Sequence, residues 1–459
     1  MIGRVAVTEA AVRAGRFTRR GFLRTAAAGA GIVLTGSTDM LHTAPAAAPG
    51  YGPLLRDPKG VLDLPAGFSY RVVTQAGRTK LEAGGPTPRN HDGTGAFPRP
   101  GGGTVLVNNH EIREPEGTKN QVPHLDGLVY DPGAAGGCTV IETDAVGRPL
   151  REYVGIAGTS TNCAGGVTPW NTWLTGEETE QRAGGKGYER DHGYVFEVDP
   201  FDPAANRDPA PIRALGRYSH EACAVDPRSG EIYLTEDASG PNGLLYRWTP
   251  PAGFRSGKGS LRALGPADGV LAAMRCTDAS GKHVDDLSRA TDVGTEYAVE
   301  WVPIDDREAR KQSTRKQHGD DDVTRAHKLE GCWWDGNGVH VVSSYAGGES
   351  PERHDGQLWF YDAARSRLTL GLLLQAGEEE FDRPDNISVS PYGGVILAQD
   401  GNGDNGLFGV TAAGDPFPLA RASGSEFTGP VYSADGAVLF ANIQEPGTMF
   451  AITGPWRRS

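Results

Sequence analysis

Six pairs of short hydrophobic strands recur along the chain, and this repetition constrains the fold more than any other feature. In each pair the first strand ends in polar or acidic residues, and a second strand follows after a turn. The 65 glycines and an aromatic content of only 8% also favour a turn-rich β protein. Repeats at irregular spacing predict an all-β fold, a six-bladed β-propeller with loop and helical insertions. The first strands are expected at residues 104–107, 172–175, 231–235, 339–343, 395–398 and 438–441.

One segment interrupts the repeats. Between about 250 and 325 the pattern lapses, and residues 305–325 carry many charges and almost no large apolar side chains. We expect a solvated, partly helical insertion here, between the third and fourth blades. The chain from 47 to 459 then forms a single propeller domain that contains this insertion.

The ends of the first strands share a chemical character. If each first strand takes the same place in its blade, all the ends lie at one pole of the propeller. Carboxylates gathered there cannot all stay ionised unless a cation lies among them. Acids at strand ends also favour turns, which is the alternative for one or two of them. The acids expected to converge are Glu111, Glu178, Glu236 or Asp237, Asp400 and Glu445.

A cysteine beside a glycine turn precedes one of these acidic ends. It belongs to the segment Thr161-Asn162-Cys163-Ala164-Gly165-Gly166, and the Glu177-Glu178 pair follows. Thiolates bind iron, zinc or copper, whereas carboxylates bind calcium, magnesium or manganese. Together they predict a site with both types of ligand. The alternative is a buried cysteine followed by a solvated acidic pair. The chain has five cysteines, so at least one lacks a disulfide partner, and Cys163 is our candidate.

A second set of polar residues precedes the strand that starts near residue 222. Arg217 and His220 come just before Glu221, an acid that enters an otherwise apolar stretch. His220 is a ligand, a general acid or a packed imidazole, and these alternatives stay open. Glu221 is the more informative residue, and we take it as a candidate metal ligand.

Two further segments add donors ahead of apolar strands. Lys328 and Glu330 form either a buried ion pair or a cationic group for an anionic substrate beside a metal ligand. Asp385 and Asn386 follow Pro384, which stiffens the approach to its strand. Both segments are candidates for the same acidic pole.

The first 46 residues are expected to be an export signal. Thr18-Arg19-Arg20-Gly21-Phe22-Leu23 is a twin-arginine pattern, and the apolar run 26–34 that follows is too short to span a bilayer. Ala44-Pro45-Ala46 offers a small-residue cleavage site, with no cysteine nearby for a lipid anchor. We therefore expect export by the Tat translocation machinery to the periplasm or the exterior, without a stable membrane anchor.

The charge balance and the missing motifs restrict the function. The formal net charge is −13, and removal of the arginine-rich leader makes it more negative. Such a protein avoids nucleic acid and anionic membranes and concentrates cations. The sequence has no phosphate loop, no Gly-x-Ser-x-Gly elbow and no His-Glu-x-x-His helix, so metal-assisted chemistry remains.

A closed propeller hides its sheet edges, and we expect a monomer.

Four motifs resemble those of the PhoX-type secreted alkaline phosphatases, in the same order and over nearly the whole chain after the leader. They are Asn109-His110-Glu111, Cys163-Ala164-Gly165-Gly166 with Thr168-Pro169-Trp170, Gly216-Arg217-Tyr218 with His220-Glu221, and Phe381-Asp382 with Pro384-Asp385. The resemblance implies Tat export, a six-bladed propeller and a phosphomonoesterase centre with iron and calcium. It also implies that Cys163, Glu221 and Glu330 are iron-side ligands, and that Glu111, Glu178 and Asp385 are further ligands.

Two positions differ from the family's usual pattern. Gly176 stands where a second cysteine is usual, and Lys328 stands where an arginine is expected two residues before Glu330. A lysine neutralises a phosphate but cannot hold two of its oxygens with a planar fork.

The expected function is metal-dependent hydrolysis of small, soluble phosphate monoesters by in-line attack of water at the acidic pole. Lys328, with help from Arg217, would offset the charge that develops. The first alternative is a calcium-dependent lactonase or esterase, which would use Asn386 near a central calcium and need no thiolate. The second is a non-enzymatic exported propeller that calcium ions merely stabilise.

Overall fold

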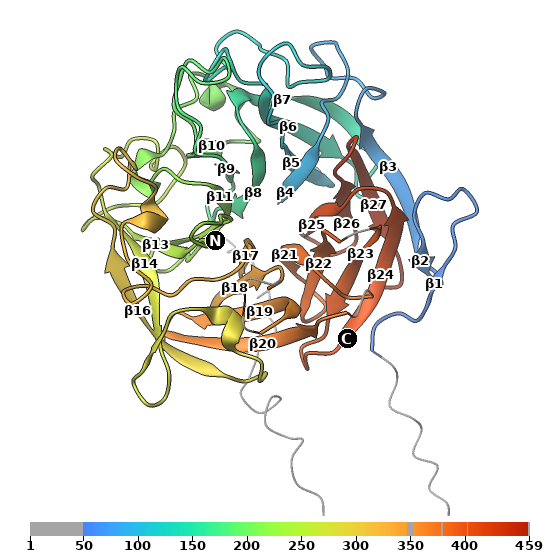
Figure 1. Cartoon of the computed structure of the whole chain (residues 1–459). Coiled ribbons are helices and arrows are strands. Elements are labelled where there is room, and N and C mark those ends of the chain that lie inside the picture. Colours follow the sequence, from blue (N-terminus) through green and yellow to red (C-terminus); the bar gives the residue numbers. More distant parts are fainter. Residues whose placement is uncertain (1–48, 347–349, 351, 378–379, 402, 458–459) are drawn as a thin grey trace, which may run out of the picture.

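The computed structural model describes residues 49–457 apart from 347–349, 351, 378–379 and 402. Nearly all of its regular structure is β-strand, so the prediction of an all-β fold is confirmed. The sheets stand around a common centre in a propeller-like arrangement (Figure 1). The export signal predicted at residues 1–46 lies outside the described residues.

The first two large sheets are antiparallel meanders, in which consecutive strands pair through short turns and through two longer loops, 111–135 and 178–194. One has the strand order β4-β5-β6-β7, and the next has the order β10-β9-β8. Their strands are β4 (His91–Pro98), β5 (Thr104–His110), β6 (Gly136–Thr143), β7 (Pro149–Thr159), β8 (Asn162–Val167), β9 (Trp173–Glu177) and β10 (Val195–Val198).

Ten strands form the largest sheet, which consists of two meanders joined at their outer edges. Strand β16 makes the join, because it pairs with β14 on one side and with β20 on the other. The segment expected as an insertion, about 250–325, supplies β14 to β16. The strands are β11 (His220–Val225), β12 (Ile232–Glu236), β13 (Leu245–Thr249), β14 (Val270–Thr277), β15 (His283–Val284), β16 (Glu296–Pro303), β17 (Leu329–Trp334), β18 (Gly338–Ser343), β19 (His354–Asp362) and β20 (Arg367–Gln375).

Helical structure in the described residues is limited to short 3-10 turns. Two of them lie in the segment from 250 to 325, where we expected partly helical structure. The turns are η1 (Pro203–Asn206), η2 (Arg213–Leu215), η3 (Leu287–Arg289) and η4 (Thr314–Lys316).

Strands from both ends of the chain close the ring. The last meander lacks an outer strand of its own, and β3 (Ser69–Gln75) supplies it by pairing with β27 (Figure 1). A small sheet of β1 (Leu54–Leu55) and β2 (Leu64–Pro65) contacts β24. The remaining strands are β21 (Pro384–Val389), β22 (Val395–Gln399), β23 (Asp404–Val410), β24 (Pro416–Ser423), β25 (Phe427–Tyr432), β26 (Leu439–Ile443) and β27 (Thr448–Thr453).

One strand of each meander faces the centre. These inner strands are β4, β8, β11, β17, β21 and β25, each contacts the next, and β25 returns to contact β4 (Figure 1). Apolar side chains fill the spaces between neighbouring sheets; Phe97 of β4 and Trp173 of β9 belong to one such cluster. The inner strands therefore form a closed ring, which we call the inner ring.

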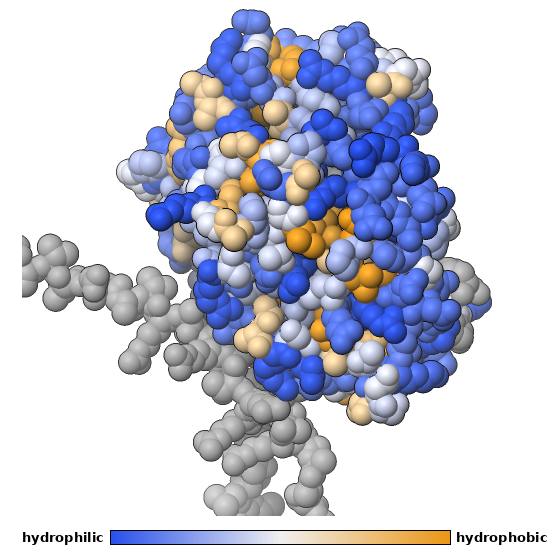
Figure 2. All heavy atoms as spheres, turned by 90° about the vertical axis from the view of Figure 1, so that its left-hand side faces the viewer, coloured by the Kyte–Doolittle hydropathy of each residue, from blue (hydrophilic) through white to orange (hydrophobic). Residues whose placement is uncertain are grey.

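One flank of the outer surface is mostly polar (Figure 2). Figure 2 shows the flank around β13, β14 and β16, where hydrophobic side chains appear in small groups among hydrophilic ones. In the described part of the chain, no helix is long and apolar enough to cross a membrane. All five cysteines lie within that part, and each is buried with its thiol free.

Candidate metal centre

Every strand of the inner ring contains a β-bulge near its first residue. The register with the next strand of the sheet shifts between His91 and Thr94 of β4 and between Asn162 and Gly165 of β8. The same shift occurs in β11, β17, β21 and β25. A bulge bends its strand and re-aims a side chain. Because the inner strands contact one another, these bulges lie together at one pole, which we call the acidic pole.

The first residue of the bulge is an acid or a cysteine in five of the six inner strands. These residues are Asp92, Cys163, Glu221, Glu330 and Asp385, all buried, with Gly429 in the remaining strand. The next residue is often small because the inner strands approach closely. A Cβ on Gly93 would lie 2.5 Å from Ala164 Cα, and one on Gly331 would lie 2.9 Å from the Asp385 carbonyl oxygen.

Side chains of neighbouring strands hold the bulges in place. Asn109 Nδ2 donates to the carbonyl oxygens of Cys163 and Ala164, both at 2.9 Å. Asn442 Nδ2 donates to the Asp92 carbonyl oxygen at 2.8 Å. The Asn109 position of the Asn-His-Glu motif therefore supports the bulge of Cys163.

Acids from the second strand of each sheet reach the same pole, since these strands run antiparallel to the inner ones. The acids that directly follow such strands are Glu111, Glu178, Asp237 and Asp400, after β5, β9, β12 and β22. Glu426 comes directly before β25 on the inner ring. The structure thus brings together acids from two sets of strand ends.

A repeated backbone hydrogen bond ties these two sets together. The N–H groups of Glu111, Glu178 and Asp400 donate to the carbonyl oxygens of the residues that precede the inner strands, at 2.8 to 3.0 Å. The accepting residues are Asn90, Thr161 and Arg383, each with a positive φ of 42° to 53°. A left-handed conformation at a non-glycine residue is strained and concentrates at functional sites.

Three groups of possible metal ligands result. Within each group the ligand atoms all lie within 4.8 Å of one another. Asp385 belongs to two of the groups, so these two are contiguous. The groups are Glu111 with Cys163 and Glu178, Glu221 with Glu330 and Asp385, and Asp385 with Asp400 and Glu426.

Burial and mutual repulsion disfavour the ionised forms of these residues. Burial and then the charge of Glu330 raise the pKa of Glu221 well above its usual value. Burial and then neighbouring acids likewise raise the pKa values of Glu178, Glu330, Asp385 and Glu426. Burial and the charge of Asp92 raise the pKa of the Cys163 thiol. Such a cluster ionises at neutral pH only with cations among its members.

The donors fit metal ions. Asp92 Oδ1 and Glu221 Oε1 are buried, and neither has a hydrogen-bond partner among the described residues. A buried acceptor without a partner is costly, and a cation would satisfy it. The Cys163 group combines a soft thiolate with carboxylates, whereas the other two groups offer only hard carboxylate oxygens.

Two cationic side chains border the cluster. Lys328 Nζ lies 3.0 Å from Glu330 Oε1, and the charge of Glu330 raises the pKa of Lys328. Arg113 Nη2 lies 2.5 Å from Glu111 Oε1 and 2.8 Å from Glu178 Oε2, while most of its side chain is exposed. Both cations can therefore meet a substrate that approaches the acidic pole.

Other predicted residues lie apart from the three groups. Glu236 is buried, and it accepts hydrogen bonds from Tyr246 and Arg315. Arg217 is buried too, and its guanidinium donates to the carbonyl oxygens of Glu180 and Gln181. Neither side chain belongs to a group of possible ligands. The sequence offered Glu236 or Asp237 at this strand end, and Asp237 is the one whose charge acts on an acid of the pole, Glu178.

Two further candidates have other surroundings. Burial lowers the pKa of His220 to about 3, so this imidazole is neutral. The centroid of its ring lies 3.7 Å from the ring centroid of Tyr218. Glu445 is exposed, and the adjacent Gln444 reaches the pole instead. Gln444 Nε2 donates to Glu111 Oε2 at 2.7 Å and to Asp92 Oδ2 at 3.1 Å.

Sequence reasoning missed Asp92, Glu426 and Arg113. Asp92 was detectable, because His91-Asp92-Gly93 repeats the order of an acid followed by a small residue seen in Glu330-Gly331. Glu426 precedes its strand without a comparable pattern. Arg113 lies only two residues beyond Glu111, but nothing in the sequence sets it apart from other arginines.

Gly176 faces a strand of the neighbouring sheet. A Cβ there would lie 3.0 Å from the His220 carbonyl oxygen and 3.1 Å from His220 Cβ. A cysteine at this position would press on the segment that carries Glu221. The packing around β11 therefore suits the glycine of this chain.

An all-β propeller-like fold with an acidic, metal-compatible pole defines the class of protein. The sequence profile for alkaline phosphatase PhoX matches residues 49–447. The chain therefore belongs to the PhoX alkaline phosphatase family, a family of phosphate-ester hydrolases. This confirms the family resemblance found in the motifs.

One solved structure shows the same fold, and two others match less well. PhoX from Pseudomonas fluorescens, in complex with vanadate as a transition-state analogue, matches with a TM-score of 0.64 and 18% identity, over 86% of this chain and 96% of that one. A gluconolactonase from Xanthomonas campestris matches with a TM-score of 0.35 and 13% identity, over 81% and 98%. A nutrient-binding protein from Bacteroides ovatus matches with a TM-score of 0.39 and 10% identity, over 85% and 78%. No curated protein matches significantly.

Proposed function

We propose that this protein hydrolyses phosphate monoesters at the acidic pole, with iron and calcium as its metals. The observation that carries the proposal is the set of bulges that present Cys163, Glu221, Glu330 and Asp385 toward one another. Family membership supports the same reaction. The small esters expected from the sequence suit a pole that Lys328 and Arg113 border.

The metals divide according to their ligands. Iron suits the thiolate of Cys163, whose group contains Glu111 and Glu178, and the family resemblance adds Glu221 and Glu330 as iron-side ligands. Calcium suits the carboxylates of Asp385, Asp400 and Glu426. Asp237 stays a further candidate ligand. When bound, the metals would neutralise the phosphoryl oxygens and lower the pKa of a bound water.

The side chains of the protein bind and orient the ester. Lys328 would contact a phosphoryl oxygen, and its position beside Glu330 and Asp400 keeps its ammonium at the edge of the cluster. We assign to Arg113 the second cationic role that the sequence suggested for Arg217. Its Nε and Nη2 donate to Glu111 and Glu178, so Nη1 of the exposed guanidinium is the group that can donate to a phosphate oxygen.

We infer that the propeller has six blades. The ten-stranded sheet would comprise two blades, β11 to β14 and β17 to β20, that β16 joins at their outer edges. One bulged inner strand then belongs to each blade. This count matches the six strand pairs of the sequence.

The twin-arginine pattern at residues 18–23 supports export through the Tat machinery to the periplasm or the exterior. Calcium is available there, whereas iron insertion would precede export. The inner edge strands of the sheets contact one another inside the closed ring, which supports a monomer.

Elemental analysis of the exported protein, together with hydrolysis of p-nitrophenyl phosphate with and without calcium, tests the proposal. We expect iron and calcium in the protein and calcium-dependent turnover. A protein with neither iron nor phosphatase activity would refute it. Lactone hydrolysis that survives Cys163→Ser would favour the lactonase alternative, although Asn386 already bonds to Asp385 and accepts from Gly429 N–H. Calcium-dependent melting without any turnover would favour a purely structural role.

A further inference from the structure

A buried network of charged side chains adjoins the acidic pole through Glu177, the residue before Glu178. His192 lies between two carboxylates, with Nδ1 2.6 Å from Glu177 Oε1 and Nε2 3.0 Å from Asp131 Oδ2. All three side chains are fully buried. Nothing in the sequence analysis pointed to His192 or Asp131.

Glu177 connects the chain segments that carry two candidate ligands. Its Oε1 accepts from Ser160 N–H at 2.9 Å, and its Oε2 accepts from Gly193 N–H at 2.8 Å. Ser160 lies three residues before Cys163, and Glu177 immediately precedes Glu178. One carboxylate therefore fixes the end of β9 against the start of β8, from which the thiol and the acid converge.

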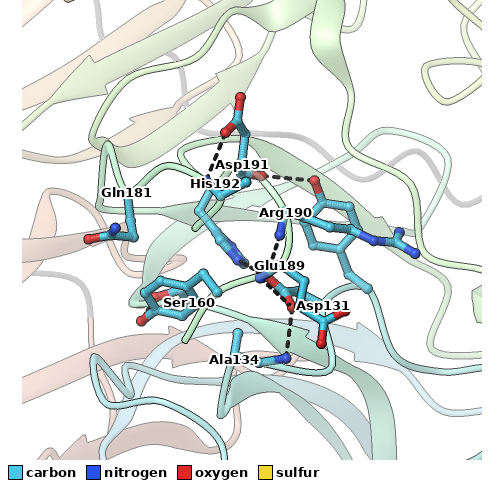
Figure 3. Close-up of polar contacts among 12 residues, drawn as sticks. Asp131, Ala134, Ser160, Gln181, Glu189, Arg190, Asp191 and His192 are labelled. Carbon is cyan, nitrogen blue, oxygen red and sulfur yellow. Dashed lines mark hydrogen bonds and ion pairs between the residues drawn. The ribbon is translucent and has the colours of Figure 1, made fainter. Parts of the chain in front are cut away.

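Asp131 anchors the other side of the network (Figure 3). Its carboxylate accepts from Gly133 N–H at 2.7 Å and from Arg190 N–H at 2.9 Å, so backbone groups of two loops hold it. Tyr188 lies beside His192, with ring centroids 4.9 Å apart, and its hydroxyl donates to the Arg113 carbonyl oxygen at 3.0 Å. The network thus reaches Arg113 as well.

The charge state of His192 matches this bridging position. Burial alone would lower the pKa of His192, but the charge of Glu177 and the two hydrogen bonds raise it to about 9. At neutral pH both ring nitrogens therefore carry protons and donate. A single buried cation compensates two buried carboxylates that would otherwise repel each other.

We propose that His192 is a positioning residue of the phosphatase centre: it holds Glu177 so that Glu178 and Cys163 keep the spacing that a metal requires. This inference rests on the proposed function. Groups that orient metal ligands in this way influence metal affinity and turnover by about 10–100-fold. A purely structural ion cluster would affect stability alone.

His192→Gln tests the proposal, because glutamine cannot donate to carboxylates on two opposite sides. We expect a folded protein that loses iron or calcium and hydrolyses p-nitrophenyl phosphate with a kcat about 10–100-fold lower and a less affected KM. His340→Gln is the matched control: His340 Nε2 lies 3.4 Å from Asp335 Oδ2, beside the turn that joins β17 and β18 at the end remote from the acidic pole. It should lower the melting temperature and keep metal content and kcat.

Glu177→Gln provides a second variant of unchanged shape, which removes the charge that His192 contacts. If His192→Gln does not fold, Glu177→Gln tests the positioning role in its place, and we expect the same loss of metal and the same decrease in kcat. A folded variant of either residue with wild-type metal content and kcat overturns the proposal, whatever its melting temperature. If the wild type hydrolyses no phosphate ester, the proposed function fails, while the metal content of the variants still tests the positioning role.

Discussion

The two ends of the inner strands differ in chemistry, although the same strands build both. At their first residues, β8, β11 and β17 present Cys163, Glu221 and Glu330 in bulges. At their last residues the same strands line an apolar cavity of about 260 Å³, whose walls include Val225 and Trp334. The pairing there is regular, so side chains alternate normally and none is re-aimed. The bulge therefore places the candidate ligands that the inner strands contribute.

Two cysteines of the inner ring show what this difference means. Cys163 occupies a bulge, with its Sγ 3.8 Å from Asp92 Oδ2. Cys223 comes two residues after the bulged Glu221 and lines the apolar cavity, where burial alone raises its pKa. Both thiols are buried to a similar degree. Place in the strand therefore separates a candidate ligand from an ordinary core residue.

The largest expected effect comes from matched substitutions of these two thiols. Cys163→Ala should remove iron and lower kcat/KM for p-nitrophenyl phosphate by about 10³-fold, which corresponds to about 4 kcal/mol. Cys223→Ala should keep iron and activity and cost about 1 kcal/mol of stability. Steady-state kinetics and iron analysis measure both. Equal activity of the two variants would contradict the assignment of Cys163 as a ligand and Cys223 as a core residue.

Removal of metals should destabilise the acidic pole in a pH-dependent way. With metals at about 100 times their Kd, chelation should lower the free energy of unfolding by about 3 kcal/mol. The loss should be larger at pH 8 than at pH 5. The raised pKa values of acids such as Glu221 mean that protons stabilise the metal-free cluster, and this stabilisation disappears as pH rises. Urea unfolding with and without chelator at both pH values checks this, and equal losses would contradict it.

The ion network beside the pole should give a smaller requirement for protons, of the same sign. Because the pKa of His192 is raised to about 9, its contribution is complete below pH 6.5 and is lost as pH rises through 9. Between pH 7 and 9 the wild type should lose about 2 kcal/mol more than His192→Gln. Unfolding of both proteins in chelator isolates the contribution of His192 to the pH dependence, since both proteins contain the same acidic cluster. Parallel pH profiles would exclude a bridging imidazolium.

The smallest effect is expected from single acids at the two ends. Asp92→Asn should weaken metal binding but stabilise the chelated protein by about 1 kcal/mol, because burial and then the charge of Glu111 raise the pKa of Asp92. Asp335→Asn should instead destabilise both the metal-bound and the chelated protein by about 1 kcal/mol. Although burial opposes it, the hydrogen bond from His340 lowers the pKa of Asp335. Thermal melts of both variants, with and without calcium, show whether each substitution stabilises or destabilises the protein.

The class of fold could be predicted because its signal is local. Short apolar runs and glycine turns repeat along the chain, and the strands expected at 104–107, 172–175 and 395–398 correspond to β5, β9 and β22. These strands are the second in their sheets, not the first. The inner strands fell outside the repeat because their bulges interrupt the alternation of side chains, although strands were expected near residue 222 and after Glu330 and Asp385.

The site could be predicted where its residues belonged to distinctive motifs or directly followed an apolar strand. Cys163, Glu221 and Asp385 were identified in this way, and the structure brings them to one pole. Arg217 was chosen for its charge, but its partners are backbone carbonyl groups that no sequence pattern reveals. Distances between ligands depend on closure of the whole ring, which no local pattern encodes.

The pairing of β3 with β27 has a consequence for the timing of folding. Residues 69–75 leave the ribosome long before their partner, residues 448–453, is made. At the usual rate of synthesis, about 5–20 residues per second, β3 waits on the order of 20 to 80 s for its partner. The ring therefore closes only after residues 448–453 have been made, and until then the edge of β3 that pairs with β27 has no partner strand.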